Sequence, residues 1–134
     1  MNKVKFILEP KYSDLNGHIS EAGYLTIANE AIWKIFDSIG LIEIFLAEKI
    51  GPIIFATQLH FKKEAMAGEE VLIPFKAKLY ASNRKILRKT DILNQAGEVA
   101  VQITSNGAFL NLKKRKVIPA SDKIIRKFNK FLIN

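Results

Sequence analysis

Tyr12–Gly40, YSDLNGHISEAGYLTIANEAIWKIFDSIG, is the stretch that decides the fold. It begins with a short polar turn and continues as the longest helix-period segment in the chain. Ser20 is a good N-cap for that segment, and Gly40 is a good residue at which to end it. We therefore expect a helix over about 21–39. Its apolar residues recur at steps of three and four and so share one face: Leu25, Ala28, Ile32, Ile35, Phe36 and Ile39.

The chain on both sides of this helix reads mainly as strands. A first strand is expected over 3–8, and after Pro52 the apolar period changes from helical to two. Short turns separate the later strands, which favours an antiparallel meander over 53–63, 70–81, 85–94 and 99–112. On the strand over 53–63, the alternation predicts one shared face for Ile53, Phe55, Thr57, Leu59 and Phe61.

Two further segments complete the expected architecture. Residues 41–50 fit a short helix or a covering loop, and residues 119–134 fit a final amphipathic helix. A strongly apolar helix followed by an antiparallel sheet must bury its apolar side on that sheet. The sequence therefore predicts a single α+β domain over 1–134, with a sheet of about five antiparallel strands wrapped around one long central helix.

Composition narrows the class of protein. The chain has 134 residues, 49% hydrophobic and 25% charged, which fits one globular domain with a real core. It contains no cysteine, which excludes disulfides, thiolate metal sites and cysteine nucleophiles. The first ten residues lack a signal-peptide hydrophobic region, and no apolar run approaches the roughly 18 residues of a membrane span. We expect a cytoplasmic protein with no membrane span.

Positive charge is concentrated at one end of the chain. The net charge is +8, and from Lys113 onward eight basic residues face one acid. Such an end fits either an anionic partner or a solvated tail, and the basic set Arg84, Lys85, Arg88 and Lys89 leaves the same choice open. Nucleic-acid binding is not favoured, because the chain has no helix-turn-helix or zinc-finger spacing and its aromatic residues lie on apolar faces.

Asp14 is the sharpest candidate for chemistry. An aspartate in the turn Asp14-Leu-Asn-Gly is often structural, since its side chain can cap the turn. It also precedes a helix start, where backbone N–H groups without intrahelical partners can hold a developing oxyanion. A carboxylate beside such amides could act as nucleophile or general base in acyl transfer or hydrolysis. The residues alone leave both interpretations open.

The other polar candidates are less specific. His18 could be a base, a hydrogen-bond donor or a turn residue, whereas His60 shares a strand face with Gln58 and reads as a satisfied or surface group. Glu30, near the middle of the helix, could face a site or solvent. Two histidines without HExxH-type spacing predict no metal site. No G-x-S-x-G elbow or phosphate-loop pattern is present.

Asp14-Leu-Asn-Gly-His-Ile, followed by Tyr24-Leu and the helix, resembles the start of the hot-dog-fold acyl-CoA thioesterases of the 4-hydroxybenzoyl-CoA thioesterase type. In that family an Asp-x-x-Gly-His-Val-Asn-Asn stretch precedes the central helix. The similarity continues in order and spacing over nearly the whole chain. It includes Gly51-Pro-Ile-Ile-Phe, Phe61 through Ala67-Gly-Glu-Glu-Val, Gly97-Glu-Val-Ala and Phe109-Leu-Asn-Leu-Lys-Lys-Arg-Lys.

The resemblance implies the hot-dog fold, a homodimer or homotetramer, and an acyl-CoA or acyl-carrier-protein substrate bound at the subunit interface. No cofactor is implied beyond the coenzyme A of the substrate. Asp14 would be the catalytic carboxylate, and the backbone N–H nearest Glu21 would be the oxyanion donor. His18 belongs to the same motif. Basic side chains that could meet the phosphates of coenzyme A are Arg84, Lys85 and the run that begins at Lys113.

The sequence departs from the family pattern just before the helix. Tyr12 stands where the family often has an acid, and Ser20-Glu21 replaces the usual Asn-Asn. Ser20 can still cap, but Glu21 adds negative charge beside the expected carbonyl site. A non-catalytic acyl-CoA- or acyl-carrier-binding protein is therefore the alternative. A hot-dog dehydratase fits less well, because His60-Phe61 is followed by lysine rather than proline.

Overall fold

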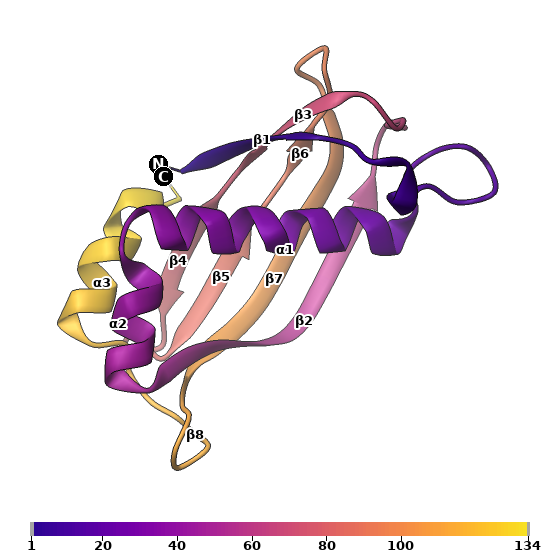
Figure 1. Cartoon of the computed structure of the whole chain (residues 1–134). Coiled ribbons are helices and arrows are strands. Elements are labelled where there is room, and N and C mark those ends of the chain that lie inside the picture. Colours follow the sequence, from indigo (N-terminus) through magenta and orange to yellow (C-terminus); the bar gives the residue numbers. More distant parts are fainter. Residues whose placement is uncertain (1, 134) are drawn as a thin grey trace.

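The computed structural model describes residues 2–133. Helices and strands form two layers, with the helices on one side of a single antiparallel sheet (Figure 1). The helical elements are η1 (Pro10–Tyr12), α1 (Glu21–Ser38), α2 (Leu41–Glu48), α3 (Asp122–Phe128) and η2 (Asn129–Phe131). The strands are β1 (Lys3–Ile7), β2 (Ile50–Phe61), β3 (Glu70–Pro74), β4 (Lys76–Tyr80), β5 (Lys85–Lys89), β6 (Ile92–Leu93), β7 (Val99–Asn111) and β8 (Lys116–Val117). The α+β class with an antiparallel sheet is confirmed.

Strand β7 is the centre of the sheet. It has 13 residues and pairs with β2 along one edge and with β6 and then β5 along the other. The sheet continues outward through β3 to β1 and through β4, while β2 lies at the opposite edge. Strands β2 and β7 pair from Ile50↔Asn111 to Phe61↔Val101. The start of β7 therefore lies at the end of the sheet that holds Phe61, and the end of β7 lies at the end that holds Ile50.

Helix α1 begins and ends close to the predicted residues. The Oγ of Ser20 accepts a hydrogen bond from the Gly23 N–H at 3.0 Å, which confirms the N-cap. At the other end Gly40 adopts φ 75°, a left-handed conformation that glycine favours and that turns the chain into α2. The apolar face of the helix packs on the sheet, and its buried residues are Tyr24, Ile27, Ala28, Ala31, Ile32, Ile35 and Phe36.

The core has two parts. One lies where α1 ends and α2 and α3 meet, and its aromatic rings pack edge to face, for example Phe36 on Phe75 at 5.3 Å and Phe75 on Phe131 at 4.9 Å between centroids. The other lies under the first half of α1, where Ile27, Ala31 and Tyr24 pack on β3, β6 and β7. Each fully buried aromatic or branched side chain stabilises the fold by about 1.5–3 kcal/mol.

The sheet has eight strands rather than about five, because two predicted strands divide and a short one is added. The strand expected over 70–81 divides into β3 and β4 at Phe75, since β3 pairs with β1 whereas β4 pairs with β5. Pro74 ends β3 and has no N–H to continue the ladder. The strand expected over 85–94 divides into β5 and β6, and the turn after β7 forms β8.

A bulge in β2 corrects the predicted face of that strand. The pairing with β7 shifts between Ile54 and Ala56, so Phe55 is the additional residue and is 59% exposed. Before the bulge Ile54 lies opposite Gly107, and after it Thr57 lies opposite Ser105. The expectation that Phe55 shares a face with Thr57 is therefore wrong, because a bulge reverses which residues of the pleat face the helix.

Helix α2 fits the short helix expected for its segment, whereas the C-terminal helix is shorter than expected. Residues 41–50 contain α2 rather than only a covering loop. The helix expected over 119–134 is α3, with 7 residues, followed by η2. Ser121 caps α3 by accepting from the Ile124 N–H at 3.3 Å, so the helix starts three residues later than predicted.

Gly107 should tolerate alanine less well than Gly51, although both lie in the β2–β7 ladder. A Cβ on Gly107 would overlap the Ile53 carbonyl oxygen, whereas one on Gly51 would meet only the movable end of Leu112 at 3.3 Å. We expect Gly107→Ala to lower the free energy of unfolding by about 1–3 kcal/mol. Gly51→Ala should change it by less than about 0.5 kcal/mol. Urea denaturation measures both, and equal values would contradict this role of Gly107.

Candidate functional site

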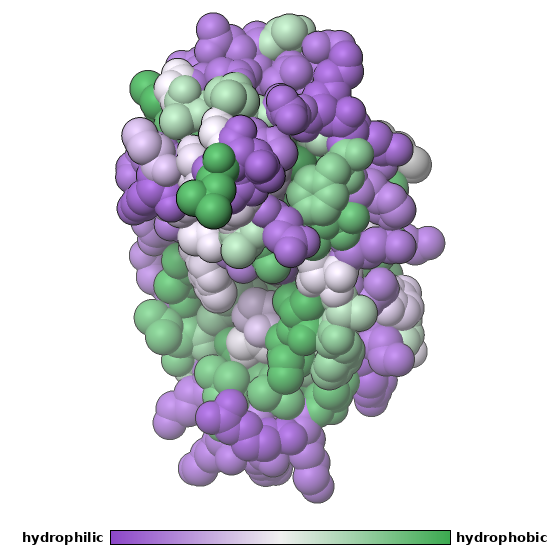
Figure 2. All heavy atoms as spheres, turned by 90° about the vertical axis from the view of Figure 1, so that its right-hand side faces the viewer, coloured by the Kyte–Doolittle hydropathy of each residue, from purple (hydrophilic) through white to green (hydrophobic). Residues whose placement is uncertain are grey.

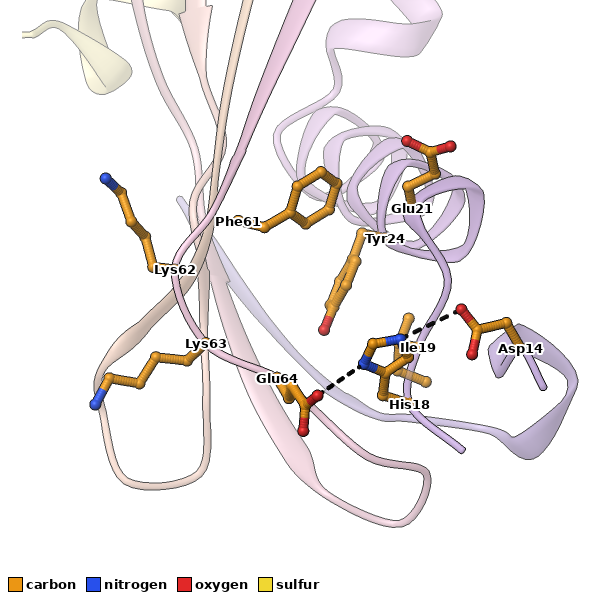
Figure 3. Close-up of a pocket in the computed structure, with 9 residues that line it drawn as sticks. All are labelled: Asp14, His18, Ile19, Glu21, Tyr24, Phe61, Lys62, Lys63 and Glu64. Atoms are coloured by element: carbon orange, nitrogen blue, oxygen red, sulfur yellow. Dashed lines mark hydrogen bonds and ion pairs between the residues drawn. The ribbon is translucent and has the colours of Figure 1, made fainter. Parts of the chain in front are cut away.

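An open cavity of about 440 Å³ lies at the N-terminal end of α1. Its walls come from the loop before α1, the first turn of α1, and the chain that leaves β2 (Figure 3). Seen from that end, the molecule shows hydrophobic atoms across the middle and hydrophilic atoms above and below (Figure 2). The lining residues are Asp14, His18, Ile19, Glu21, Tyr24, Phe61, Lys62, Lys63 and Glu64.

The loop that carries Asp14 is a tight turn closed by its own hydrogen bonds. The Asp14 N–H donates to the His18 carbonyl at 2.9 Å, and the Gly17 N–H donates to the Asp14 carbonyl at 3.1 Å. Gly17 adopts φ 82°, which glycine permits. The Oδ1 of Asp14 accepts from the Asn16 N–H at 2.8 Å, which is the turn-capping role expected for aspartate.

The second oxygen of Asp14 faces His18. Asp14 Oδ2 lies 3.3 Å from His18 Nε2, and His18 Nδ1 lies 3.2 Å from Glu64 Oε1 (Figure 3). An imidazole donates to both carboxylates only when both of its nitrogens carry a proton. His18 therefore connects the Asp14 turn to the segment after β2. Its distance to Asp14 Oδ2, the oxygen that the Asn16 N–H does not bind, is at the long end of the hydrogen-bond range.

The start of α1 borders the same cavity through Glu21. Ser20 satisfies two of the first amides, because its Oγ accepts from Gly23 and its carbonyl accepts from Tyr24 at 3.0 Å. Within residues 2–133, the N–H groups of Glu21 and Ala22 have no hydrogen-bond acceptor. The Glu21 side chain is exposed on the cavity rim. These amides are the kind of group that can stabilise an oxyanion.

Tyr24 fixes the opposite wall of the cavity. Its hydroxyl oxygen accepts a hydrogen bond from the Ala65 N–H at 3.0 Å, and the residue is 3% exposed. Burial raises the pKa of Tyr24, so the hydroxyl keeps its proton. The ring lies 6.0 Å from that of Phe61, centroid to centroid. This contact gives the cavity an apolar side opposite the carboxylates.

The two lysines on the rim have different surroundings. Lys63 Nζ lies 2.6 Å from Glu98 Oε2, and this hydrogen bond lowers the pKa of Glu98. The backbone N–H groups of Lys62 and Lys63 both donate to the Ala100 carbonyl. Figure 3 shows both side chains pointing away from His18. They contribute positive charge to the mouth of the cavity rather than partners for Asp14.

The structure brings together some of the residues singled out from the sequence and separates others. Asp14, His18 and Glu21 line one cavity. Arg84 and Lys85 lie near Ala108 on β7, whereas the cavity residue Phe61 pairs with Val101, roughly 23 Å away at about 3.3 Å per residue. Lys113 lies farther still, in the turn after β7. Within one chain these basic residues do not share the cavity.

Sequence reasoning missed Glu64 and Phe61 as members of the site. Glu64 follows two lysines and reads as part of a solvated charge run, and it meets His18 only because the chain folds back after β2. The strand alternation placed Phe61 on one face with Thr57 and Leu59, but nothing indicated a cavity there. Glu30 is exposed and accepts from the Tyr12 hydroxyl at 3.2 Å, and His60 is exposed.

No group of three or more His, Cys, Asp or Glu side chains among residues 2–133 is arranged to hold a metal ion. None of the described helices is long and apolar enough to cross a membrane.

Several solved structures with the same architecture are named as thioesterases, and one was solved with CoA. The structure superposes on a 1,4-dihydroxy-2-naphthoyl-CoA thioesterase from Synechocystis with TM-score 0.83 and 14% identity, covering 96% of this chain and 95% of that one. A DHNA-CoA thioesterase from Staphylococcus aureus gives TM-score 0.83 and 17% identity, with 96% and 89% coverage. The Staphylococcus aureus protein SAV2348, solved in complex with CoA, gives 0.85 and 12%, with 98% and 85% coverage. At these identities the likeness shows the fold.

Sequence comparison supplies the family. No curated protein sequence matches the chain. Residues 8–128, however, match the family described as the thioesterase-like superfamily. The match begins before the Asp14 turn and ends in α3, so it contains the cavity, helix α1 and strands β2 to β8. The chain therefore belongs to the thioesterase-like superfamily.

Proposed function

We propose that this protein hydrolyses the thioester of an acyl-CoA, or of an acyl-carrier protein, to a free acid and a thiol. The observation that carries the proposal is the placement of the Asp14 carboxylate and of Glu21, whose amide has no acceptor in residues 2–133, on one cavity. Membership of the thioesterase-like superfamily supports it. We further propose that the fold is the hot-dog fold with α1 as its central helix, and that the Asp14 motif is of the 4-hydroxybenzoyl-CoA thioesterase type.

The proposed reaction uses the groups that the cavity gathers. Asp14 attacks the thioester carbon or activates a water molecule that attacks it. The carbonyl oxygen becomes an oxyanion, which the Glu21 amide stabilises. The C–S bond then breaks and the thiolate leaves. In the general-base route it takes the proton that Asp14 removed from the attacking water; in the nucleophile route, water then hydrolyses the mixed anhydride on Asp14, which releases the acid and supplies the proton. Because Asn16 holds Oδ1 firmly and His18 holds Oδ2 at 3.3 Å, Oδ2 is the oxygen more readily released for reaction.

The negative charge of Glu21 bears on the same step. Its carboxylate is exposed, so solvent screens it, but it belongs to the residue whose N–H would bind the oxyanion. A neutral side chain at this position would oppose the developing negative charge less. The departure from the family pattern at Ser20-Glu21 therefore adds negative charge beside the oxyanion position and keeps the N-cap of the helix.

We also propose a homo-oligomer in which coenzyme A lies between subunits. In residues 2–133, the outer edge of β2 pairs with no other strand. An exposed edge of this kind can pair with a second copy. If two β2 strands run antiparallel, the basic end of one copy, with Arg84, Lys85 and Lys113, comes beside the cavity of the other. This arrangement would join the two sets of candidate residues that one chain keeps apart. A cytoplasmic location remains a prediction.

Asp14→Asn should reduce kcat/KM for acyl-CoA hydrolysis by on the order of 10³-fold or more, because it removes a nucleophile or base. A panel of short, long and aromatic acyl-CoAs, followed by thiol release, measures the change. Asp37→Asn is the matched control, since Asp37 is an exposed aspartate at the far end of the same helix. Unchanged hydrolysis in Asp14→Asn would remove this mechanism. Tight acyl-CoA binding without wild-type hydrolysis would favour a non-catalytic binding protein.

Glu21→Pro tests the oxyanion donor separately from the carboxylate. Glu21 is the first residue of α1, where proline fits the helix but has no N–H. Ser20 has φ −73° and ψ 161°, a conformation compatible with a following proline. We expect Glu21→Pro to lower kcat by about 10²-fold, as for other lost oxyanion donors. Glu21→Gln should instead raise kcat a few-fold. Equal kcat in the two variants, with matched melting temperatures, would exclude this amide as the donor.

The basic residues should affect affinity rather than chemistry. Combined Arg84→Gln and Lys113→Gln should raise KM for acyl-CoA by about 3- to 10-fold with little change in kcat, through lost charge-assisted phosphate contacts. The same acyl group on pantetheine, which lacks the nucleotide phosphates, should show no change.

Sedimentation should report a dimer or tetramer. A fully active monomer would contradict the shared site.

A further inference from the structure

Arg88 places a positive charge between the sheet and α1. It lies in β5 opposite Ser105 of β7 and Ala77 of β4. Both neighbours are 0% exposed, and residues directly opposite each other in a sheet share a face, so Arg88 points to the helix-covered side. Its Nη2 donates to Asn29 Oδ1 of α1 at 3.2 Å.

The surroundings leave this charge largely without partners. Among residues 2–133, Arg88 forms no ion pair, and its bond to the neutral Asn29 is its one side-chain hydrogen bond. A guanidinium has five N–H donors, so most of them lack a protein acceptor. Burial lowers the pKa of Arg88, which reflects the cost of holding the charge away from water. A partly desolvated charge without a carboxylate is costly unless a ligand supplies an acceptor.

The free donors of Arg88 can be reached from outside. Among residues 2–133, Asp91 Oδ1 is the only fully buried side-chain nitrogen or oxygen atom that has no hydrogen-bond partner. The unpaired nitrogens of Arg88 are therefore in contact with solvent. A polar row leads to them from the open edge of the sheet: exposed Thr57 bonds to buried Ser105 at 2.9 Å between hydroxyl oxygens, and Ser105 lies opposite Arg88.

This polar row lies deeper along the helix than the Asp14 cavity. Asn29 is eight residues from Glu21, which is about 12 Å along α1. Thr57 is four residues from Phe61, which is about 13 Å along β2. Apolar side chains lie before and beyond the row, among them Ile103 and Ile86. A few convergent polar groups in an apolar setting are typical of a ligand site.

We propose that Arg88, held by Asn29, binds a carboxylate at the far end of the acyl group. The preferred substrates would then be thioesters of dicarboxylic acids, with the thioester at Asp14 and the second carboxylate at Arg88. The guanidinium matches a carboxylate geometrically through paired N–H···O bonds. The inference rests on the proposed thioesterase function for its substrate, but the partly buried charge itself does not depend on that function.

The test compares ω-carboxyacyl-CoAs with alkyl acyl-CoAs of equal chain length. We expect the wild-type protein to favour the carboxylated series in kcat/KM by about tenfold or more at its best length, as for a hydrogen bond to a charged group. Arg88→Met should bring this ratio to about one. Lys89→Met is the matched control: Lys89 is the next residue of β5, faces the other side of the sheet, is exposed, and should leave the ratio unchanged.

The remaining outcomes separate this inference from the proposed function. Three results would overturn the inference and leave the proposed thioesterase function intact. They are hydrolysis of alkyl acyl-CoAs with no preference for a carboxylate, a preference for ω-hydroxyacyl-CoAs, and the same ratio in Arg88→Met as in the wild-type protein. If Arg88→Met does not fold, Arg88→Gln replaces it, with melting temperature as the check.

If the wild-type protein hydrolyses no thioester, calorimetry with free dicarboxylic and monocarboxylic acids decides. Tighter binding of the dicarboxylic acid that is lost in the Arg88 variant supports the site even then. Equal binding of the two acids overturns it. Size-exclusion chromatography is run on each variant, because an altered oligomer with an unaltered ratio would assign Arg88 to subunit contact and also overturn the inference.

Discussion

The anchored start of α1 is the constraint on which the site depends. The Ser20 N–H donates to the Tyr12 carbonyl at 2.8 Å, and the Ile19 N–H donates to the Ala65 carbonyl at 3.0 Å. Gly23 allows this approach, because a Cβ there would lie 2.7 Å from the Tyr12 carbonyl oxygen. These contacts join the loop, the helix and the chain after β2. In residues 2–133 the N–H groups of Glu21 and Ala22 in the first turn are left without an acceptor, and Glu21 lines the same cavity as Asp14.

Much of the fold near the helix could be predicted because its signals are local. The cap, the apolar period and the terminal glycine of α1 all lie within the helix or next to it, and the Asp14 turn is formed by residues 14–18. The division of the strand over 70–81 could not be predicted, since its alternation continues and only its partner changes. The Phe55 bulge was likewise hidden, because it lies where β2 meets β7 beside Gly107, a contact between segments far apart in the sequence.

The parts of the site that escaped prediction are long-range contacts of charged residues. His18 and Glu64 are 46 residues apart, and Asn29 and Arg88 are 59 apart. In the sequence Glu64 and Arg88 each stand beside other charges, and such runs usually read as solvated surface. Strand alternation places Arg88 and Lys89 on opposite faces, and the fold shows that the Arg88 face is the one under the helix. Sequence periodicity gives the face of a strand, but not which charge on that face lacks a partner.

The division of the core explains how the site can hold so many charged groups. The far end of α1 is fixed by a dense aromatic cluster that includes Phe36, Phe75 and Phe128, all at most 2% exposed. The near end relies more on smaller side chains and on hydrogen bonds such as that from Ala65 to Tyr24. Because the aromatic end supplies much of the burial, the near end can keep an open cavity and partly desolvated charges. Functional sites commonly depend on stability located elsewhere in this way. Helix α1 connects the two ends, so the packing of its aromatic end helps to fix the position of the cavity residues at its other end.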